Sequence, residues 1–211
     1  AGGALAVVCL VWGTNLYNFM DGMDGFAGGM AAIGFGTLAA LAWASGDASG
    51  ALVAAVAGAG AGGFLLWNFP PARVFMGDVG SLLLGFLAAA LILRAHDRGD
   101  VPLWQGLLIF APFVVDATWT LVRRAMRGER VWLAHRTHFY QRVVQLGWGH
   151  RRTVLVEYAL MIGCAISAVA ASRLGVVGQW AVIAVWAAIF AGCMRWIALA
   201  ERRQRRDGAT T

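Results

Sequence analysis

The chain has 211 residues, of which 60% are hydrophobic and 13% are charged, and its mean hydropathy is +0.67. These values exclude an ordinary water-soluble domain. The net charge is +6 and every basic residue is an arginine, a pattern that beside apolar segments is typical of contact with anionic headgroups, so we expect a membrane partner and no nucleic acid. The three cysteines lie in apolar segments without paired spacing, which argues against a disulfide or a metal site.

Apolar segments of about 20 residues, the length that crosses a bilayer, recur along the chain. The opening run, residues 1–14, is apolar but short for a crossing, and we expect the sequence to begin partway through a helix of a longer protein. Further spans are predicted at residues 26–45, 51–68, 81–93, 103–122, 153–172 and 179–199. The predicted fold class is all-α, a polytopic membrane helix bundle that forms a single membrane domain over residues 1–211.

The loops between these spans alternate sides, and their arginines decide the orientation. Most arginines lie in one set of loops, residues 15–25, 69–80, 123–152 and the tail 200–211. The opposite set holds little more than Arg98 and Arg173, with Arg94 at the end of a span. The positive-inside bias places this set in the cytoplasm, so every motif-rich loop is predicted on one face of the membrane.

The first cluster of polar residues is the segment NLYNFMDGMDGFAGG, in which Asn15, Asn18, Asp21 and Asp24 recur at intervals of three. On a helix, this spacing keeps neighbours on adjacent parts of one face. Carboxylates at a membrane boundary are costly unless they are hydrated, paired or bound to a cation, and amides add oxygen ligands. The cluster therefore favours a cation or ligand site, and a solvated helix end with capping residues stays open as the alternative.

The second cluster, WNFPPARVFMGDVGS, is a proline-interrupted loop in which glycines bracket Asp78. A carboxylate on such a turn before a helix is a hard oxygen ligand suited to Mg²⁺, and the nearby helix N-terminus attracts phosphate. A helix cap would account for Asp78 alone. It would not account for Asn68, Arg73 and Phe75 in the same short loop.

The third cluster, HRTHFYQR, lies in the basic loop 123–152. Because no third ligand of the zinc type accompanies His135 and His138, these histidines and Arg136 favour contacts with phosphate oxygens. A solvated basic loop is the alternative. Asp116 lies within a predicted span, where structural anchoring is favoured slightly over catalysis. No role is assigned to three isolated titratable residues, His96, His150 and Glu157.

In this order and on one membrane face, the three clusters resemble the polyprenyl-phosphate N-acetylhexosamine-1-phosphate transferases. That family includes the phospho-N-acetylmuramoyl-pentapeptide transferases and the enzymes that initiate O-antigen chains. The resemblance covers residues 12–142, and the motif NLYNFMDGMDG is most similar to that of the O-antigen-initiating branch. It implies a bundle of ten or eleven membrane helices, of which this chain would hold the C-terminal part.

The resemblance also implies roles for residues at matching positions. The expected metal is Mg²⁺, with Mn²⁺ as the alternative, held by Asp78 of the FMGD motif and by Asn18. The residues expected to bind the uracil and diphosphate of a UDP-N-acetylhexosamine are Asn15, Asn68, Phe75 and Arg136. The expected catalytic residues, of which the histidines would hold the diphosphate and the carboxylates would assist at the uracil, are Asp21, Asp24, His135 and His138.

The implied reaction transfers a sugar 1-phosphate from the UDP-sugar to polyprenyl phosphate, with release of UMP, at the start of cell-envelope glycan synthesis such as that of O-antigen. The implied location is the bacterial inner membrane, with the active site on the cytoplasmic face and a homodimer as an open alternative for the assembly. The family also has an adjacent aspartate pair that this sequence lacks, so we expect that pair upstream and no turnover by this segment alone. A transporter with intramembrane carboxylates is the alternative function, although its polar residues would lie near the midplane.

Overall fold

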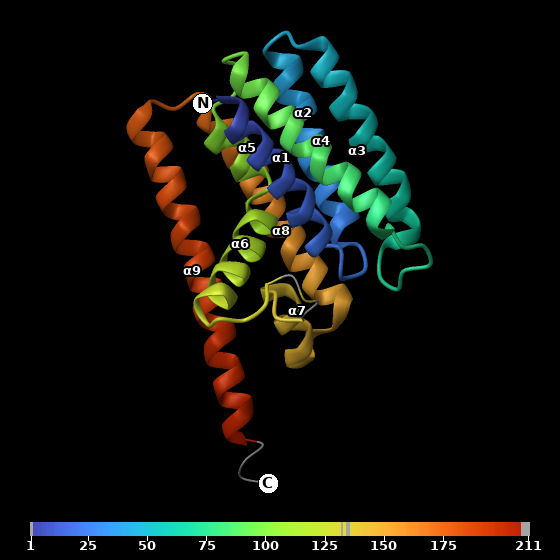
Figure 1. The fold of residues 1–211 in the computed structure, drawn as a ribbon, viewed down its shortest axis with the longest axis vertical. Coiled ribbons are helices and arrows are strands. Elements are labelled where there is room, and N and C mark those ends of the chain that lie inside the picture. The colour runs from blue at the N-terminus through green and yellow to red at the C-terminus, as the bar shows by residue number, and fades with distance from the viewer. Residues whose placement is uncertain (1, 132, 134–135, 208–211) are drawn as a thin grey trace.

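The computed structural model describes residues 2–131, 133 and 136–207, and this part of the chain consists of helices and loops without a strand (Figure 1). Six helical segments in it are long and apolar enough to cross a bilayer, and the bent pair α5 and α6 makes a seventh candidate. The predicted all-α polytopic bundle is confirmed. The elements in chain order are α1 (Gly2–Phe19), α2 (Phe26–Ala44), α3 (Ala48–Asn68), α4 (Gly77–Asp97), α5 (Leu103–Ile109), α6 (Ala111–Met126), α7 (Phe139–Val143), the π-helical turn η1 (Val144–Trp148), α8 (Gly149–Ala171) and α9 (Val176–Asp207).

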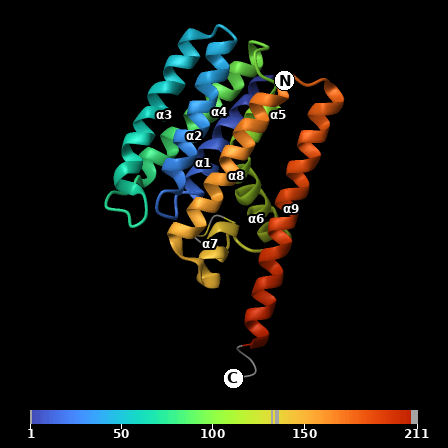
Figure 2. The same ribbon diagram turned by 180° about the vertical axis from the view of Figure 1, so that it is seen from behind.

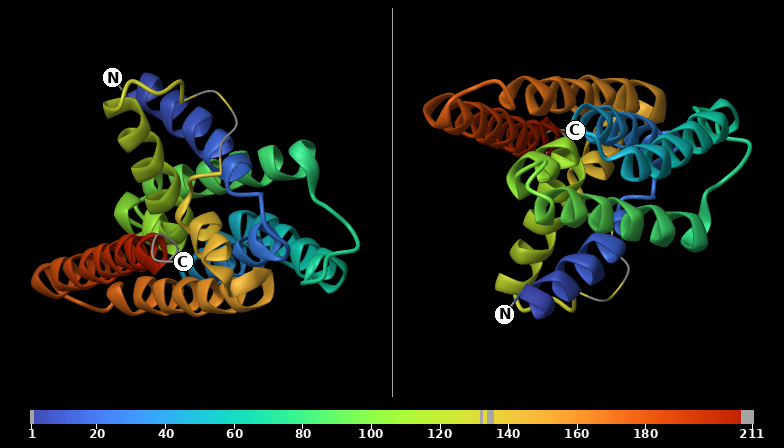
Figure 3. Two further views of the ribbon diagram at one scale, coloured as in Figure 1. Left: turned by 90° about the horizontal axis from the view of Figure 1, so that it is seen from below. Right: turned by 90° about the horizontal axis from the view of Figure 1, so that it is seen from above.

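Successive long helices run in alternating directions, so the loops gather at the two ends of the bundle (Figure 1; Figure 2). One end carries the C-terminal ends of α1, α3 and α6, the start of α4, and α7. We call it the motif end and define it by the described residues of 20–25, 69–76 and 127–148. Views along the bundle show α9 on its outside (Figure 3). The described parts of all three polar clusters therefore meet at one end of the fold.

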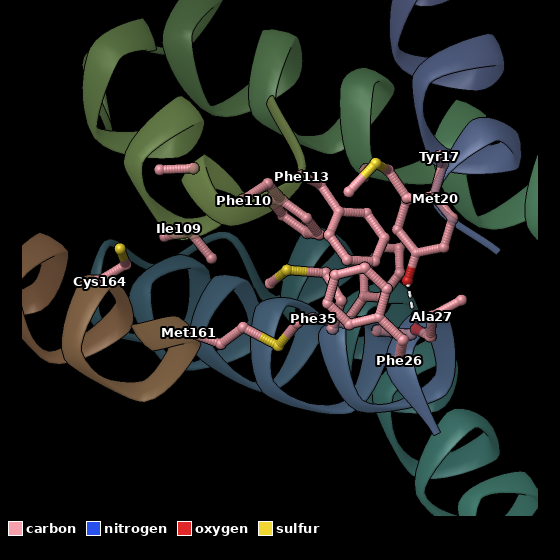
Figure 4. Close-up of a cluster of buried hydrophobic side chains, with 14 of the residues drawn as sticks. Tyr17, Met20, Phe26, Ala27, Phe35, Ile109, Phe110, Phe113, Met161 and Cys164 are labelled. Carbon is pink, nitrogen blue, oxygen red and sulfur yellow. Dashed lines mark hydrogen bonds between the residues drawn. The ribbon is translucent and has the colours of Figure 1, made fainter. Parts of the chain in front are cut away.

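A core of aromatic and sulfur-containing side chains holds α1, α2 and α6 together (Figure 4). Tyr140 of α7 belongs to the same buried cluster. The rings of Phe26 and Phe113 lie 4.7 Å apart, and those of Phe26 and Tyr140 are equally close. Tyr17 packs 5.0 Å from Phe113 and donates its hydroxyl to the carbonyl oxygen of Ala27 at 2.7 Å. Tilted ring pairs of this kind add to the stabilisation from burial. The loop after α1 is therefore anchored on both of its sides.

Glycines let α1 and α4 pack closely in antiparallel directions. A Cβ atom added at Gly85 would lie 2.6 Å from the carbonyl oxygen of Gly13, a distance that no side chain tolerates. Small residues at such crossings let two backbones approach within a membrane. With Gly13 facing Gly85, the antiparallel register brings the last turn of α1 beside the first turn of α4. This contact positions the residues of the first and second clusters.

The observed helices differ in detail from three of the predicted segments. The single span predicted at 103–122 is broken at Phe110, where α5 and α6 meet at 91°, because Pro112 lacks an N–H group and its ring clashes with the preceding turn. The helix expected to start at residue 81 starts at Gly77, which has a positive φ of 66°. The expected tail 200–211 is helical up to Asp207 as the end of α9.

The opposite end of the bundle is closed by an ion pair. Asp47 accepts two hydrogen bonds of 2.8 Å from the Arg94 guanidinium and a third from the Gly50 backbone N–H at 3.1 Å. These hydrogen bonds, led by those of Arg94, hold the pKa of Asp47 well below its usual range. The pair ties the turn between α2 and α3 to the end of α4.

Candidate functional site

The centre of the candidate site is a contact between Asn18 on α1 and Asp78 in the first turn of α4. The Asn18 amide nitrogen donates to Asp78 Oδ1 at 3.1 Å and to Ser81 Oγ at 2.9 Å. Both of these contacts use the amide nitrogen, which leaves the amide oxygen for a ligand. Asp78 is exposed and lies at a helix N-terminus, where the helix dipole stabilises its charge. The structure thus joins the first two clusters, 60 residues apart in the sequence.

Asp21 lies next to this pair in the loop that follows α1. Burial, and secondly the negative charge of Asp78, raise the pKa of Asp21 to about 6. The helical spacing expected for residues 15–24 ends at Phe19, so Asp21 and Asp24 lie on the loop and not on one helix face. Asn15 does lie on α1, where its exposed amide donates to the Val11 carbonyl at 2.7 Å.

The donor set at Asn18, Asp21 and Asp78 fits a magnesium ion. Mg²⁺ is usually bound by one or two carboxylates together with substrate phosphates, and it keeps several waters. The repulsion that helps to raise the pKa of Asp21 is what a cation beside Asp78 would relieve. Among the described residues there is no group of three His, Cys, Asp or Glu side chains arranged for a metal, which is unlike a closed zinc site.

Asp24 joins three segments of the motif end. Its Oδ2 accepts a hydrogen bond of 3.1 Å from the Ala72 backbone N–H, and the same oxygen lies 3.4 Å from His150 Nδ1. No role could be predicted for His150 from the sequence, because nothing near it in the sequence indicates a partner 126 residues away. Asp24 and His150 therefore form a further titratable pair beside the loop that precedes α4.

Asn68 fixes the shape of two loops. Its side chain is buried; Oδ1 accepts from the Gly25 N–H at 2.9 Å and Nδ2 donates to the Val74 carbonyl at 2.8 Å. Gly25 has a φ of 75°, which favours glycine, and its carbonyl accepts a 2.6 Å hydrogen bond from the Tyr158 hydroxyl. The predicted contact of Asn68 with uracil stays a prediction, since backbone groups engage both ends of its amide here. Phe75, 74% exposed in the same loop, offers a free ring face.

Asp116 anchors the third cluster to α6. Its carboxylate accepts hydrogen bonds from the backbone N–H groups of Phe139 (2.9 Å) and Tyr140 (3.2 Å) and from Thr120 Oγ1 (3.1 Å), and Oδ1 lies 3.1 Å from His138 Nδ1. The two N–H groups open α7 and have no partner within that helix, so Asp116 caps α7 from a neighbouring element. The structural anchoring that the sequence analysis favoured for Asp116 matches these contacts.

The remaining residues of the third cluster are divided between two places. The His138 side chain is 3% exposed and faces Asp116. Arg136 is exposed and lines an arginine-rich cavity whose described lining contains none of the carboxylates near α1 and α4. His135 lies outside the described residues. The predicted contacts of His138 and Arg136 with a diphosphate stay predictions.

Comparison with known proteins identifies the relatives of this chain. The profile of "Glycosyl transferase family 4" matches residues 2–96. A protein of Bacillus subtilis strain 168 named "Probable undecaprenyl-phosphate N-acetylglucosaminyl 1-phosphate transferase" is 34% identical over 168 residues, which are 78% of this chain and 47% of that protein. A "Phospho-N-acetylmuramoyl-pentapeptide-transferase" of Geobacillus thermodenitrificans is 36% identical over 162 residues, 75% of this chain and 48% of that protein.

The similarity to these relatives extends over most of this chain. The chain spans about half the length of the curated relatives it matches. The family expected from the three polar clusters is confirmed: the chain belongs to glycosyl transferase family 4.

Proposed function

We propose that the protein transfers a sugar 1-phosphate from a UDP-N-acetylhexosamine to polyprenyl phosphate, with release of UMP. The observation that carries the proposal is the 3.1 Å hydrogen bond between Asn18 and Asp78, with Asp21 beside them. It joins an amide and two carboxylates, oxygen ligands of the kind that Mg²⁺ uses when phosphates complete its shell. The names of the relatives support a polyprenyl phosphate acceptor and a sugar-phosphate donor.

In the proposed reaction, an oxygen of the lipid phosphate forms a bond to the sugar-bearing β-phosphorus of the donor. The bond from that phosphorus to the oxygen of the α-phosphate breaks, and UMP leaves with the electron pair. When bound at Asp78 and Asn18, Mg²⁺ supplies positive charge for the diphosphate oxygens. Asp21, a carboxylate beside these residues that is ionised at neutral pH, accepts the proton that the lipid phosphate still carries.

Other residues of the motif end hold the reactants and shape the loops. Asp24 and Asn68 fix the loop that carries Phe75, whose exposed ring is suited to stack on a base. Arg136 and the histidines of the third cluster, of which Asp116 holds His138, attract the diphosphate. Arginines concentrated at this end favour the cytoplasmic face of the bacterial inner membrane, where both substrates are anionic.

The test is release of UMP by the full-length protein in detergent, with undecaprenyl phosphate, Mg²⁺ and a panel of UDP-sugars. UMP that appears only when lipid phosphate and metal are both present supports the proposal, and the most rapidly used donor identifies the sugar. UMP release that is independent of lipid phosphate would indicate a hydrolase instead. Transport of a solute by the reconstituted protein without any UMP release would support a transporter.

A further inference from the structure

An apolar groove runs between α6 and α9 on the side of α6 away from α1 and α4. On α6 its wall is formed by Val115, Trp119, Val122 and Met126, which recur at intervals of four, three and four residues along one helix face. On α9 the same spacing places small and flexible side chains opposite them, namely Ala187, Ala191, Met194 and Ala198. The groove encloses about 850 Å³, which is a ligand-sized volume.

The groove stays open because α9 packs against α8, where Trp186 lies against Gly163, and near the motif end against α7, and not along α6. Near the motif end, Ile197 packs against Phe139 of α7 and is the one buried side chain of α9 within the described residues. A bidentate ion pair between Arg142 and Glu201, with distances of 2.7 and 2.8 Å, adds a polar contact one turn further on. Above these contacts, the alanines of α9 leave space between the two helices.

The groove leads into a basic cavity at the motif end. This cavity of about 250 Å³ is lined by six arginines and two glutamates, which converge on it from α6, the loop after it, α7 and α9. Five residues line both the cavity and the groove, so the two spaces form one continuous site: Trp119, Arg123, Arg127, Phe139 and Arg142. One end of the site is apolar and the other is strongly cationic.

The arginines of the cavity exceed the acidic groups that could neutralise them. Arg142 is paired with Glu201, and Arg124 is paired with Glu129 at 2.8 Å. Within the described part of the chain, Arg123 and Arg205 have no carboxylate within 4.0 Å. Permanently charged guanidinium groups that converge on a cavity favour a phosphate group there.

We propose that this site binds an anionic phospholipid of the membrane, with the phosphate in the arginine cavity and an acyl chain in the groove between α6 and α9. The apolar length of the site favours a lipid over a free phosphate, and its excess of positive charge favours an anionic lipid over a zwitterionic one. The described lining contains none of Asn18, Asp21 and Asp78, so the lipid lies outside the proposed metal site. Of the described residues proposed to attract the donor diphosphate, the lining includes Arg136.

The charge arm of the test is native mass spectrometry of the full-length protein with added phosphatidylglycerol or phosphatidylcholine. Arg123→Gln combined with Arg205→Gln should weaken retention of phosphatidylglycerol about tenfold, because each arginine near an anionic headgroup contributes to binding. Arg151→Gln combined with Arg202→Gln removes the same charge from residues outside the site and should leave retention within about twofold. Equal retention by both double variants, or equal binding of the two lipids, would overturn the proposal.

The groove arm separates a lipid from a free phosphate. Ala191→Trp should fill the groove and reduce phosphatidylglycerol retention, whereas Ala188→Trp, at an exposed position of α9 outside the lining, should not. Millimolar inorganic phosphate should fail to displace the lipid. Displacement by phosphate with no effect of Ala191→Trp would show a free-anion site and reject the lipid.

Discussion

Replacing Asp116 with alanine should release α7 from α6. The Asp116 side chain is 8% exposed and accepts the N–H groups of Phe139 and Tyr140 at 2.9 and 3.2 Å. Alanine leaves both donors without their acceptor, and it also leaves His138 without its partner. The third cluster would then lose its contact with α6, while the Asn18–Asp78 contact should persist.

The expected size of this effect follows from the free-energy cost of leaving two N–H donors without an acceptor. A buried N–H group that loses its acceptor costs about 1–3 kcal/mol, so the two together cost at least about 2 kcal/mol. Since each 1.4 kcal/mol is a factor of ten, opening of α7 should become at least about 30-fold more frequent. Hydrogen exchange followed by mass spectrometry should show this loss of protection in peptides that contain residues 139 and 140.

The matched control is Asp97→Ala, which removes an exposed carboxylate at the far end of α4 and should leave exchange of α7 unchanged. Asp116→Asn keeps an oxygen that accepts from one of the donors and should give a smaller effect than alanine. Unchanged protection of residues 139 and 140 in Asp116→Ala would refute the capping role of Asp116.

Three further changes test the rest of the site. Because the pKa of Asp21 is raised to about 6, binding of Mg²⁺ measured by calorimetry should weaken several-fold from about pH 7 to about pH 5. This pH dependence should shrink in Asp21→Asn, and equal pH profiles for the two proteins would contradict a role of Asp21 in metal binding. Asn68→Ala strands the partners of both amide atoms and should destabilise the protein by about 2–4 kcal/mol, measured as a fall in thermal midpoint in detergent; an unchanged midpoint argues against loop fixation. Gly85→Leu should force α1 and α4 apart and lower both the thermal midpoint and the rate of UMP release. Gly60→Leu, at a position with open space, should be tolerated. Equal effects of the two substitutions would contradict the close approach of α1 and α4.

The membrane architecture could be predicted because its signal is local. Apolar runs and arginine-rich loops depend on composition over about 20 residues, and they predicted the bundle. The pairing of Asn18 with Asp78 could be expected only through the resemblance of their motifs to a family, since the contact is made across two helices. The small residues Gly13 and Gly85, which allow that contact, look like ordinary apolar positions in the sequence.

Other features depend on long-range contacts or on single residues with a strong local effect. The partner of Asp24 is His150, which reaches the site because α8 starts at the motif end. Asn68 belongs to the second cluster, yet its amide is hydrogen-bonded to the backbone of Gly25 and Val74, and no spacing of residues in the sequence predicts these contacts. The break before α6 follows from Pro112. The continuous apolar pattern around this proline predicts one unbroken span, so the break could not be expected from hydropathy.

Asp78 is expected to support transfer of a phosphosugar to a lipid phosphate. The most direct measurement is ³¹P NMR of the full-length protein with Mg²⁺, undecaprenyl phosphate and the preferred UDP-sugar, comparing wild type with Asp78→Asn and with the matched variant Asp97→Asn. We predict new UMP and lipid diphosphate signals for wild type, the same rate within about twofold for Asp97→Asn, and a fall of about 100-fold or more for Asp78→Asn. Equal rates for all three proteins would contradict a role of Asp78 in the transfer.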